Sequence, residues 1–397
     1  MTFDLQKLDL KILAGGKKIS DKSFKPFDDN VCEFIISLSG LIMRSKFAKK
    51  YTDLVALAFW CSKRNILKMK NSNKSNNFRI GHGLLFHITP SNVPTNFFYS
   101  LVFGLLSGNS NIVKVPSKNF YQTTIICDFI NKLLNIKKFK KLSENISIIS
   151  YQNEKFDKIN SVLSSQCDFR IIWGGDRTID TVREHRLKPL SNEITFGDRY
   201  SLSVMNLDKI NSLSNEKIKK IARLFYNDTY VADQNACSSP HFILWYGKKK
   251  RNMFWNELNN YILSKYKIPM NAITEKYNKY CIDMTKDYFL SGKIFSQSLY
   301  VIDLKKLPKN LDQLRGKWGY FYQYYTQDLK HFSKFINNKF QTLTYYGFDK
   351  KYFLNLIVDN NIKGIDRVVP IGSGLNMNLV WDGYDIINIL SRIKYFE

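Results

Sequence analysis

Apolar and polar residues follow two alternating patterns over much of the first half of the chain. A buried-strand run occupies residues 83–89, and further short strands rich in apolar residues are expected at residues 111–115, 146–150 and 169–173. Stretches with the apolar spacing of a helix follow them at residues 97–106, 120–134, 155–163 and 177–186. Strands that alternate with helices at this spacing predict a largely parallel, doubly wound α/β sheet.

The first part of the chain has a more mixed pattern. Helices are expected at residues 31–43 and 51–66, and the polar, turn-forming residues 68–77 are expected to form an exposed loop before the α/β region. The N-terminus has no apolar stretch typical of a signal peptide, and the longest uncharged stretch is broken by proline and glycine. We therefore expect no membrane span.

Ligands of doubly wound sheets bind at the carboxyl ends of the strands, where three loops of this chain have unusual residues. Flanking prolines can hold the Asn92 amide rigidly as a hydrogen-bond donor. Gly174 and Gly175 would let a pyrophosphate approach the N-terminus of a helix, and Lys114 or Lys118 could meet a ribose or a phosphate. A turn asparagine, a tight glycine turn and solvated lysines are the structural alternatives.

A second candidate site lies in the stretch YNDTYVADQNACSSPHFILWY, residues 226–246. A helical pattern runs into a turn of small residues that contains Cys237, and the apolar run Phe242–Tyr246 then predicts a buried strand. A thiol with small neighbours on such a turn is accessible to a substrate carbonyl and close to backbone N–H donors, which makes Cys237 a candidate nucleophile. The alternative is a buried structural cysteine. His241, four residues later, could tune the thiol or make a structural hydrogen bond.

Composition adds two constraints. The six cysteines are scattered without a CxxC pair or a zinc-like cluster, so we expect a reducing cytoplasm and no metal site. The net charge of +26 favours anionic ligands or partners. A nucleic-acid-binding protein is the competing interpretation of that charge, but no recognised nucleic-acid motif is present. Biased genome composition would also explain lysines spread this evenly.

Several stretches together resemble the aldehyde dehydrogenase superfamily, and within it the acyl-CoA and acyl-protein thioester reductases of the LuxC family. The matching stretches extend over most of the chain in the correct order, and they are FHITPSNVPTNFFYSLVFGLLSGNSNIVKVPS, IIWGGDRTIDTVR, EITFGDRYSLSV, DQNACSSPH, TLTYYGF and GIDRVVPIGSGLNMNLVWDGYDIINILSR. The resemblance implies an oxidoreductase with the aldehyde dehydrogenase-like fold.

The resemblance also assigns roles to single residues. Cys237 matches the acyl-accepting nucleophile, and Asn92 matches the side-chain half of the oxyanion hole. Lys114 matches the lysine near the cofactor ribose, and Gly174 with Gly175 matches the turn that faces the pyrophosphate or the nicotinamide. Glu193 is a further catalytic candidate, although Thr195 is the residue that aligns with the general-base glutamate of classical aldehyde dehydrogenases.

The implied reaction is NADPH-dependent reduction of a fatty acyl thioester, from acyl-CoA or an acyl-protein, to the aldehyde through an S-acyl-cysteine. NADH is the alternative hydride donor, and a cysteine-dependent acyltransferase or thioesterase without hydride transfer is the alternative function. Expected partners are an acyl-CoA, an acyl-carrier protein or an acyl-protein synthetase, and copies of the chain itself in a homo-oligomer.

We expect four parts along the chain. They are an N-terminal leader that packs on the cofactor domain (1–76), a nicotinamide dinucleotide-binding domain (77–207), a catalytic domain with Cys237 (208–361) and a C-terminal packing or oligomerisation segment (362–397).

Overall fold

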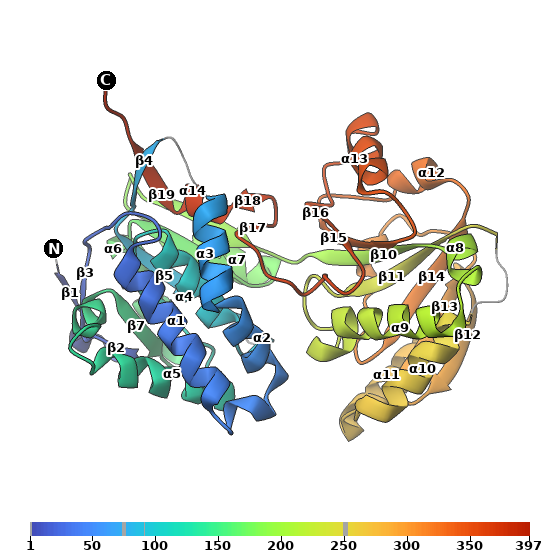
Figure 1. Cartoon of the computed structure of the whole chain (residues 1–397), viewed down its shortest axis with the longest axis horizontal. Coiled ribbons are helices and arrows are strands. Elements are labelled where there is room, and N and C mark those ends of the chain that lie inside the picture. Colours follow the sequence, from blue (N-terminus) through green and yellow to red (C-terminus); the bar gives the residue numbers. More distant parts are fainter. Residues whose placement is uncertain (1, 74–76, 91, 249–252) are drawn as a thin grey trace. The chain divides into compact units, whose positions relative to one another are not determined.

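The computed structural model describes residues 2–73, 77–90, 92–248 and 253–397 (Figure 1). The chain divides into two compact units. Unit 1 combines Met1–Asp198 with Met377–Glu397, and unit 2 comprises Arg199–Asn376. Each unit is built on its own sheet, and each is described here by itself.

Unit 1 contains a six-stranded sheet in which only the edge strand β2 is antiparallel to its neighbour. In spatial order the strands are β2 (Lys11–Gly15), β7 (Ile146–Ser150), β6 (Ser110–Lys114), β5 (Leu84–Ile88), β8 (Phe169–Trp173) and β9 (Asn192–Phe196). Every residue of β5, β6 and β8 is buried, since both faces of a parallel sheet are covered. This explains why these short strands are rich in apolar residues.

The remaining strands described in unit 1 form three two-stranded sheets. They pair β1 (Thr2–Asp4) with β3 (Lys18–Ser20), β4 (Phe78–Gly81) with β19 (Ser391–Lys394), and β17 (Val380–Trp381) with β18 (Tyr384–Asp385). The helices of unit 1 are α1 (Asp29–Arg44), α2 (Thr52–Trp60), α3 (Lys63–Ser72), α4 (Asn96–Leu106), α5 (Tyr121–Leu134), α6 (Phe156–Gln166), α7 (Asp176–Arg183) and α14 (Ile386–Ile389). Side chains of α6 and α7 share one core cluster with β5, β6 and β8.

Unit 2 contains a seven-stranded sheet, again with one antiparallel edge strand, β12. In spatial order the strands are β12 (Phe289–Ser296), β13 (Leu299–Leu304), β14 (Tyr320–Thr326), β11 (Pro240–Tyr246), β10 (Tyr200–Asn206), β15 (Phe340–Tyr346) and β16 (Arg367–Pro370). The helices are α8 (Leu207–Asn211), α9 (Asn215–Thr229), α10 (Phe254–Lys265), α11 (Met270–Met284), α12 (Leu329–Ser333) and α13 (Lys350–Asp359).

The two faces of the unit 2 sheet have separate cores. On β10, Leu202 and Val204 pack in the cluster that includes residues of α12 and α13, whereas Met205 packs in the cluster that includes α9 and α10. Figure 1 shows these two helix pairs on opposite sides of the strands. The alternation follows from the two-residue period of a strand, and it places the central strands β10, β11 and β15 in a fully enclosed layer.

The predicted α/β fold with a parallel, doubly wound sheet is confirmed. Strands at residues 146–150 and 169–173 have the predicted bounds, and the other predicted strands and helices of this region are all present. The expectation for the N-terminal part was less accurate. The segment 51–66 forms two helices, α2 and α3, and α3 continues to Ser72 into the segment that was expected to be a loop.

The units divide at different residues from those expected for the domains. The first division falls at Asp198 and not at residue 207, because β10 pairs with β11 and β15. The last division falls at Asn376 and not at residue 361, because β16 pairs with β15. Residues 377–397 return to unit 1, where β19 pairs with β4.

No helix within the described part of the chain is both long enough and apolar enough to cross a membrane. Among the same residues, no group of three His, Cys, Asp or Glu side chains is placed to hold a metal ion.

Candidate functional site

Cys237 lies on the predicted turn, between the 3-10 helix Tyr230–Ala232 and β11. Asp233 and Gln234, which lie four and three residues before Cys237, have positive φ angles of 51° and 59°. The buried Gln234 side chain holds this strained turn, because its Nε2 donates to the carbonyls of Pro240 and Tyr320, both at 3.1 Å. Its Oε1 accepts from the Tyr320 N–H at 3.0 Å. The backbone that presents Cys237 is therefore anchored to both β11 and β14.

The thiol of Cys237 is contacted from β15, and its backbone carbonyl is contacted from β10. The Gln341 Nε2 donates to Cys237 Sγ at 3.4 Å, and the Ser201 hydroxyl donates to the Cys237 carbonyl at 2.7 Å. Ser201 Oγ also accepts from the Thr342 N–H at 3.2 Å. These bonds connect the cysteine turn to two central strands of the sheet and fix the direction of its backbone.

Exposure separates Cys237 from the other cysteines. Cys237 is half-buried, whereas Cys32, Cys61, Cys127 and Cys167 are buried and Cys281 is exposed on α11. Burial raises the pKa of Cys32 to about 11 and the pKa values of Cys127 and Cys167 to about 12. Thiolates are the reactive form, so these buried thiols are unsuited to nucleophilic chemistry. Of the two remaining thiols, Cys281 is exposed to solvent, whereas Cys237 is half-buried and accepts a hydrogen bond from Gln341.

His241 lies in the core of unit 2 and stacks on Tyr200, with the ring centroids 5.6 Å apart. Burial, together with the positive charges of Arg315 and Lys317, lowers the pKa of His241 to about 3. The imidazole is therefore neutral at pH 7 and offers no positive charge to a thiolate. This arrangement favours the structural alternative for His241.

In unit 1, Asn92, Lys114 and the Gly174–Gly175 turn lie at the carboxyl ends of the parallel strands β5, β6 and β8, whereas Glu193 lies within β9. Asn92 follows β5 in the exposed loop before α4, while its neighbour Ser91 lies outside the described residues. Lys114 ends β6, and the Thr89 hydroxyl, just after β5, donates to the Lys114 carbonyl at 2.8 Å. Adjacent strands thus bring these two loops to the same edge of one sheet.

Lys114 is a buried cation whose side chain is only 7% exposed. Its Nζ lies 5.5 Å from the centre of the Tyr151 ring and 5.6 Å from that of Phe156. No carboxylate in the described part of the chain pairs with it, and burial lowers its pKa. A buried ammonium surrounded by aromatic rings retains donors for hydroxyl or phosphate oxygens, so Lys114 fits a nucleotide ligand.

The Gly174–Gly175 turn follows β8, and Gly175 is the cap residue of α7. The Gly174 N–H is used within the sheet, since it donates to the Phe196 carbonyl at 3.1 Å. A Cβ on Gly175 would lie 3.3 Å from the Asp198 carboxylate, and the Asp198 N–H donates to Asp176 Oδ1 at 3.2 Å. Two carboxylates beside the turn disfavour a pyrophosphate, because like charges repel.

Glu193 lies on β9 directly opposite Arg170 of β8. Its carboxylate accepts from Arg170 Nε at 2.7 Å and from Arg183 Nε at 2.8 Å. Arg170 is 2% exposed, so the glutamate compensates a buried charge. The arrangement favours a structural role, and a catalytic role of Glu193 stays a prediction.

The structure also identifies residues that the sequence analysis did not select, namely Gln341, Arg367 and Asp228. Gln341 directly precedes the stretch TLTYYGF that resembles the family, and Arg367 lies inside another such stretch, but neither has a local pattern that indicates a contact with a cysteine. Arg367 reaches Thr342 because β16 pairs with β15, and Gln341 reaches the cysteine turn from the start of β15.

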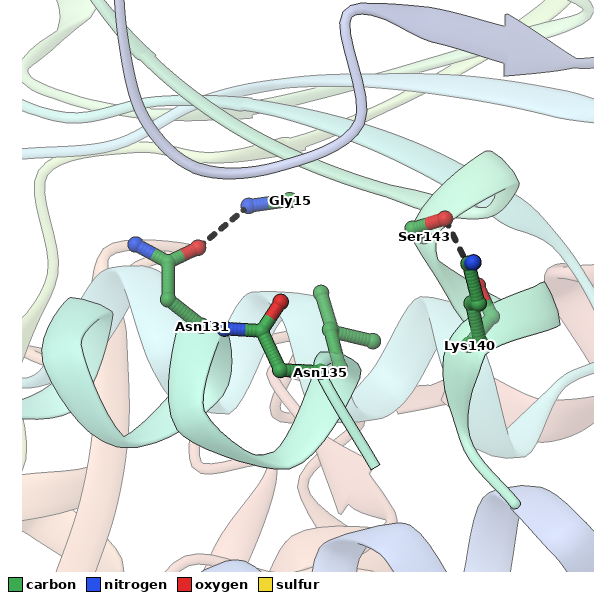
Figure 2. Close-up of a pocket in the computed structure, with 6 residues that line it drawn as sticks. Gly15, Asn131, Asn135, Lys140 and Ser143 are labelled. Carbon is green, nitrogen blue, oxygen red and sulfur yellow. Dashed lines mark hydrogen bonds between the residues drawn. The ribbon is translucent and has the colours of Figure 1, made fainter. Parts of the chain in front are cut away.

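A cavity of about 270 Å³ lies in unit 1, and none of the predicted site residues lines it. It is lined by Gly15, Asn131, Leu134, Asn135, Lys140 and Ser143. Figure 2 shows the Asn131 amide directed to the Gly15 backbone, with Ser143 and Lys140 across the cavity. Asn131 accepts from Gly15 N–H at 3.1 Å and donates to the Leu13 carbonyl at 3.1 Å, so its polar groups serve the packing of α5 on β2.

Solved structures that are similar to this chain include several aldehyde dehydrogenases. A mutant 1-pyrroline-5-carboxylate dehydrogenase of Thermus thermophilus is 11% identical, with a TM-score of 0.60 over 93% of this chain and 81% of that one. An NAD-dependent benzaldehyde dehydrogenase of Corynebacterium glutamicum is also 11% identical, with a TM-score of 0.62 over 92% of this chain and 82% of that one. The chain therefore has the aldehyde dehydrogenase-like α/β fold.

The family is given by a sequence model described as acyl-CoA reductase (LuxC), which matches residues 55–289. This match spans more than half of the chain and includes Cys237, Asn92 and Lys114. The protein belongs to the acyl-CoA reductase (LuxC) family, and it is an oxidoreductase that acts on acyl or aldehyde groups. No curated protein sequence matches the chain.

Proposed function

We propose that the protein reduces a fatty acyl thioester to the free aldehyde through an S-acyl intermediate on Cys237, with NADPH as the hydride donor. The observation that carries this proposal is the Cys237 thiol itself. It is half-buried on a turn anchored to two strands, and a buried glutamine donates to its sulfur, in a chain of the acyl-CoA reductase family.

In the first step the Cys237 thiolate attacks the thioester carbon and forms a new carbon–sulfur bond. The Asn92 amide and a backbone N–H near the cysteine stabilise the oxyanion of the tetrahedral intermediate, as the family resemblance implies. This intermediate collapses with cleavage of the original carbon–sulfur bond, and the leaving thiolate takes up a proton. An S-acyl cysteine remains on the protein.

A bound nicotinamide dinucleotide supplies the hydride that converts the S-acyl group to a thiohemiacetal. Lys114 would hold the ribose of this cofactor, and the Gly174–Gly175 turn would face its nicotinamide side. Hydride addition leaves the thiohemiacetal oxygen as an oxyanion. This oxyanion re-forms the carbonyl as the carbon–sulfur bond breaks, so the aldehyde leaves and Cys237 regains its thiolate. No water enters this sequence, so a general base such as Glu193 is not needed for it.

The charge of the chain supports anionic donors. A net charge of +26 attracts coenzyme A, the 2′-phosphate of NADPH and acidic carrier proteins. We propose that the acyl group arrives from acyl-CoA or from an acyl-protein partner, and that the enzyme is a homo-oligomer.

The test is incubation of the protein with NADPH and a series of acyl-CoA thioesters, followed by measurement of NADPH oxidation and aldehyde formation. Cys237→Ala should abolish aldehyde formation, and Cys281→Ala should retain it, because Cys281 is exposed and lies on α11. Replacing NADPH by NADH shows which donor is preferred.

Label from an acyl donor should appear on Cys237 when the nicotinamide is omitted. If wild-type protein instead releases free fatty acid without consuming NADPH, the protein is a thioesterase of the alternative class. If acyl groups appear on an added thiol acceptor, it is an acyltransferase.

A further inference from the structure

Gln341 is the buried side chain that contacts the candidate nucleophile. It is 0% exposed near the start of β15, and its Nε2 lies 3.4 Å from Cys237 Sγ. The two residues are 104 positions apart in the sequence. Only the tertiary structure brings this buried amide of β15 into contact with the sulfur on the turn before β11.

Neighbouring groups fix which end of the amide faces the sulfur. Thr342 Oγ1 lies 3.2 Å from Gln341 Oε1, and Arg367 Nη1 donates to Thr342 Oγ1 at 3.2 Å. A guanidinium has only donors, so the threonine hydroxyl accepts from Arg367 and gives its own proton to the amide oxygen. The NH₂ group of Gln341 is then the end directed to the sulfur.

Arg367 is held in place on the far side of this chain of hydrogen bonds. Its guanidinium donates to the carbonyls of Gly374 at 3.1 Å and Asn376 at 3.0 Å. The Asp228 carboxylate accepts from the N–H groups of Gly372 at 2.6 Å and Gly374 at 2.7 Å. The loop after β16 is thus fixed from both sides, and the guanidinium cannot turn away without breaking several bonds.

We propose that Gln341 is a catalytic residue that holds the Cys237 sulfur as an oriented thiolate, and that Thr342 and Arg367 position it. A donor that bonds the charged form of an acid stabilises that form. The cooperative chain from the guanidinium through the hydroxyl to the amide strengthens the last bond. This inference rests on the proposed role of Cys237 as nucleophile.

The chemistry of an amide suits a reductase. Gln341 neither accepts nor releases a proton at neutral pH, so it stabilises the thiolate without activating water against the S-acyl intermediate. The same N–H donor stabilises sulfur again when the thiohemiacetal collapses and the thiolate leaves. One side chain therefore assists both the formation and the cleavage of the carbon–sulfur bond.

Other ionisable groups lie on the elements around the cysteine turn. They are Asp228 on α9, Asp233 before the turn, His241 on β11, Lys339 before β15 and Arg367 on β16. Burial raises the pKa of Asp228 to about 7, so it titrates in the same range as a perturbed thiol. A comparison of variants that all retain Asp228 isolates the contribution of Gln341.

The experiment measures iodoacetamide alkylation of Cys237, peptide by peptide with mass spectrometry, from about pH 6 to about pH 10 on both sides of the pKa of a free thiol. No substrate or cofactor is added. The exposed thiol of Cys281 in the same molecule is the internal reference. The variants are Gln341→Met, which has a similar length but no donor, and Gln341→Glu, which places a carboxylate beside the sulfur.

Loss of the donor should raise the midpoint of Cys237 alkylation by about one pH unit in Gln341→Met, and Gln341→Glu should raise it further through like-charge repulsion. Thr342→Val should give a smaller shift in the same direction. Its matched control is Thr344→Val on the same strand, because the Thr344 hydroxyl has no hydrogen-bond partner within the described residues. Thr344→Val and Cys281 should show no shift.

An unchanged midpoint in Gln341→Met, with circular dichroism and thermal unfolding like those of the wild type, overturns the inference. If Gln341→Met does not fold, the test rests on Thr342→Val. A midpoint of Cys237 alkylation in Thr342→Val that equals the midpoint in Thr344→Val overturns the inference. Failure of the proposed function gives a different result. The alkylation midpoint of Cys237 would then still differ between the wild type and Gln341→Met, but Cys237 of the wild type would take no label from any acyl donor.

Discussion

Two buried lysines, Lys114 in unit 1 and Lys276 in unit 2, show how the same side chain serves two purposes. Both are less than a tenth exposed, and burial lowers the pKa of each, that of Lys276 to about 7. Lys276 Nζ donates to the carbonyls of Gln297 at 3.0 Å and Trp318 at 2.8 Å, and it lies 4.4 Å from the centre of the Tyr300 ring. Its donors are used by the fold.

Lys114 has aromatic rings beside it but no carboxylate partner in the described part of the chain. A buried ammonium requires acceptors for its three donors, and a ligand with hydroxyl or phosphate oxygens would provide them. The difference teaches that burial and a lowered pKa alone do not identify a binding residue. The number of acceptors that the fold already provides is the better criterion.

The largest expected effect is on stability. Lys276→Met leaves the carbonyls of Gln297 and Trp318 without this donor, and it should reduce the free energy of unfolding of unit 2 by about 3 kcal/mol. Lys114→Met should change stability by less than about 1 kcal/mol, because no carbonyl or carboxylate of the described chain loses a partner. Chemical denaturation of both variants, followed by tryptophan fluorescence, measures the two values. Equal losses would remove the distinction between the lysines.

The next largest effect is on how the loss of unfolding free energy in Lys276→Met depends on pH. The pKa of Lys276 is about 7 in the folded chain and 10.5 in a model compound, so the unfolded chain binds more protons between these values. The contribution of this group to stability therefore rises as the pH rises through 7, and the penalty should grow by about 2 kcal/mol between about pH 7 and pH 9. Urea denaturation of wild type and variant across this range tests it. A constant difference would show that the carbonyls keep the ammonium charged.

The smallest effect concerns cofactor binding. If Lys114 contacts the nucleotide, Lys114→Met should weaken NADPH binding about tenfold through loss of one charge-assisted hydrogen bond. Lys118→Met is the matched control, because Lys118 is an exposed lysine four residues further along the same segment. Fluorescence titration with NADPH measures both dissociation constants. A larger effect in Lys118→Met would assign the nucleotide contact to the exposed lysine.

Much of the fold could be predicted from the sequence because its signals are local. Buried parallel strands such as 146–150 and 169–173 are short stretches rich in apolar residues, and the helices between them have the 3.6-residue period. Unit boundaries were harder to predict. Tyr200–Asn206 is an apolar strand that would fit either sheet, and only its pairing with β11 and β15 assigns it to unit 2.

The sequence by itself determined the nucleophile candidate, the strand-end loops and the family, because each depends on residue types at fixed short spacing. The tertiary structure alone decided which groups surround them. The pairing of Glu193 with Arg170 and the bond from Arg367 to Thr342 join neighbouring strands, and the contact of Gln341 with Cys237 joins β15 to the turn before β11. Strand order in a parallel sheet is set by long-range packing, and no local pattern encodes which side chains it brings together.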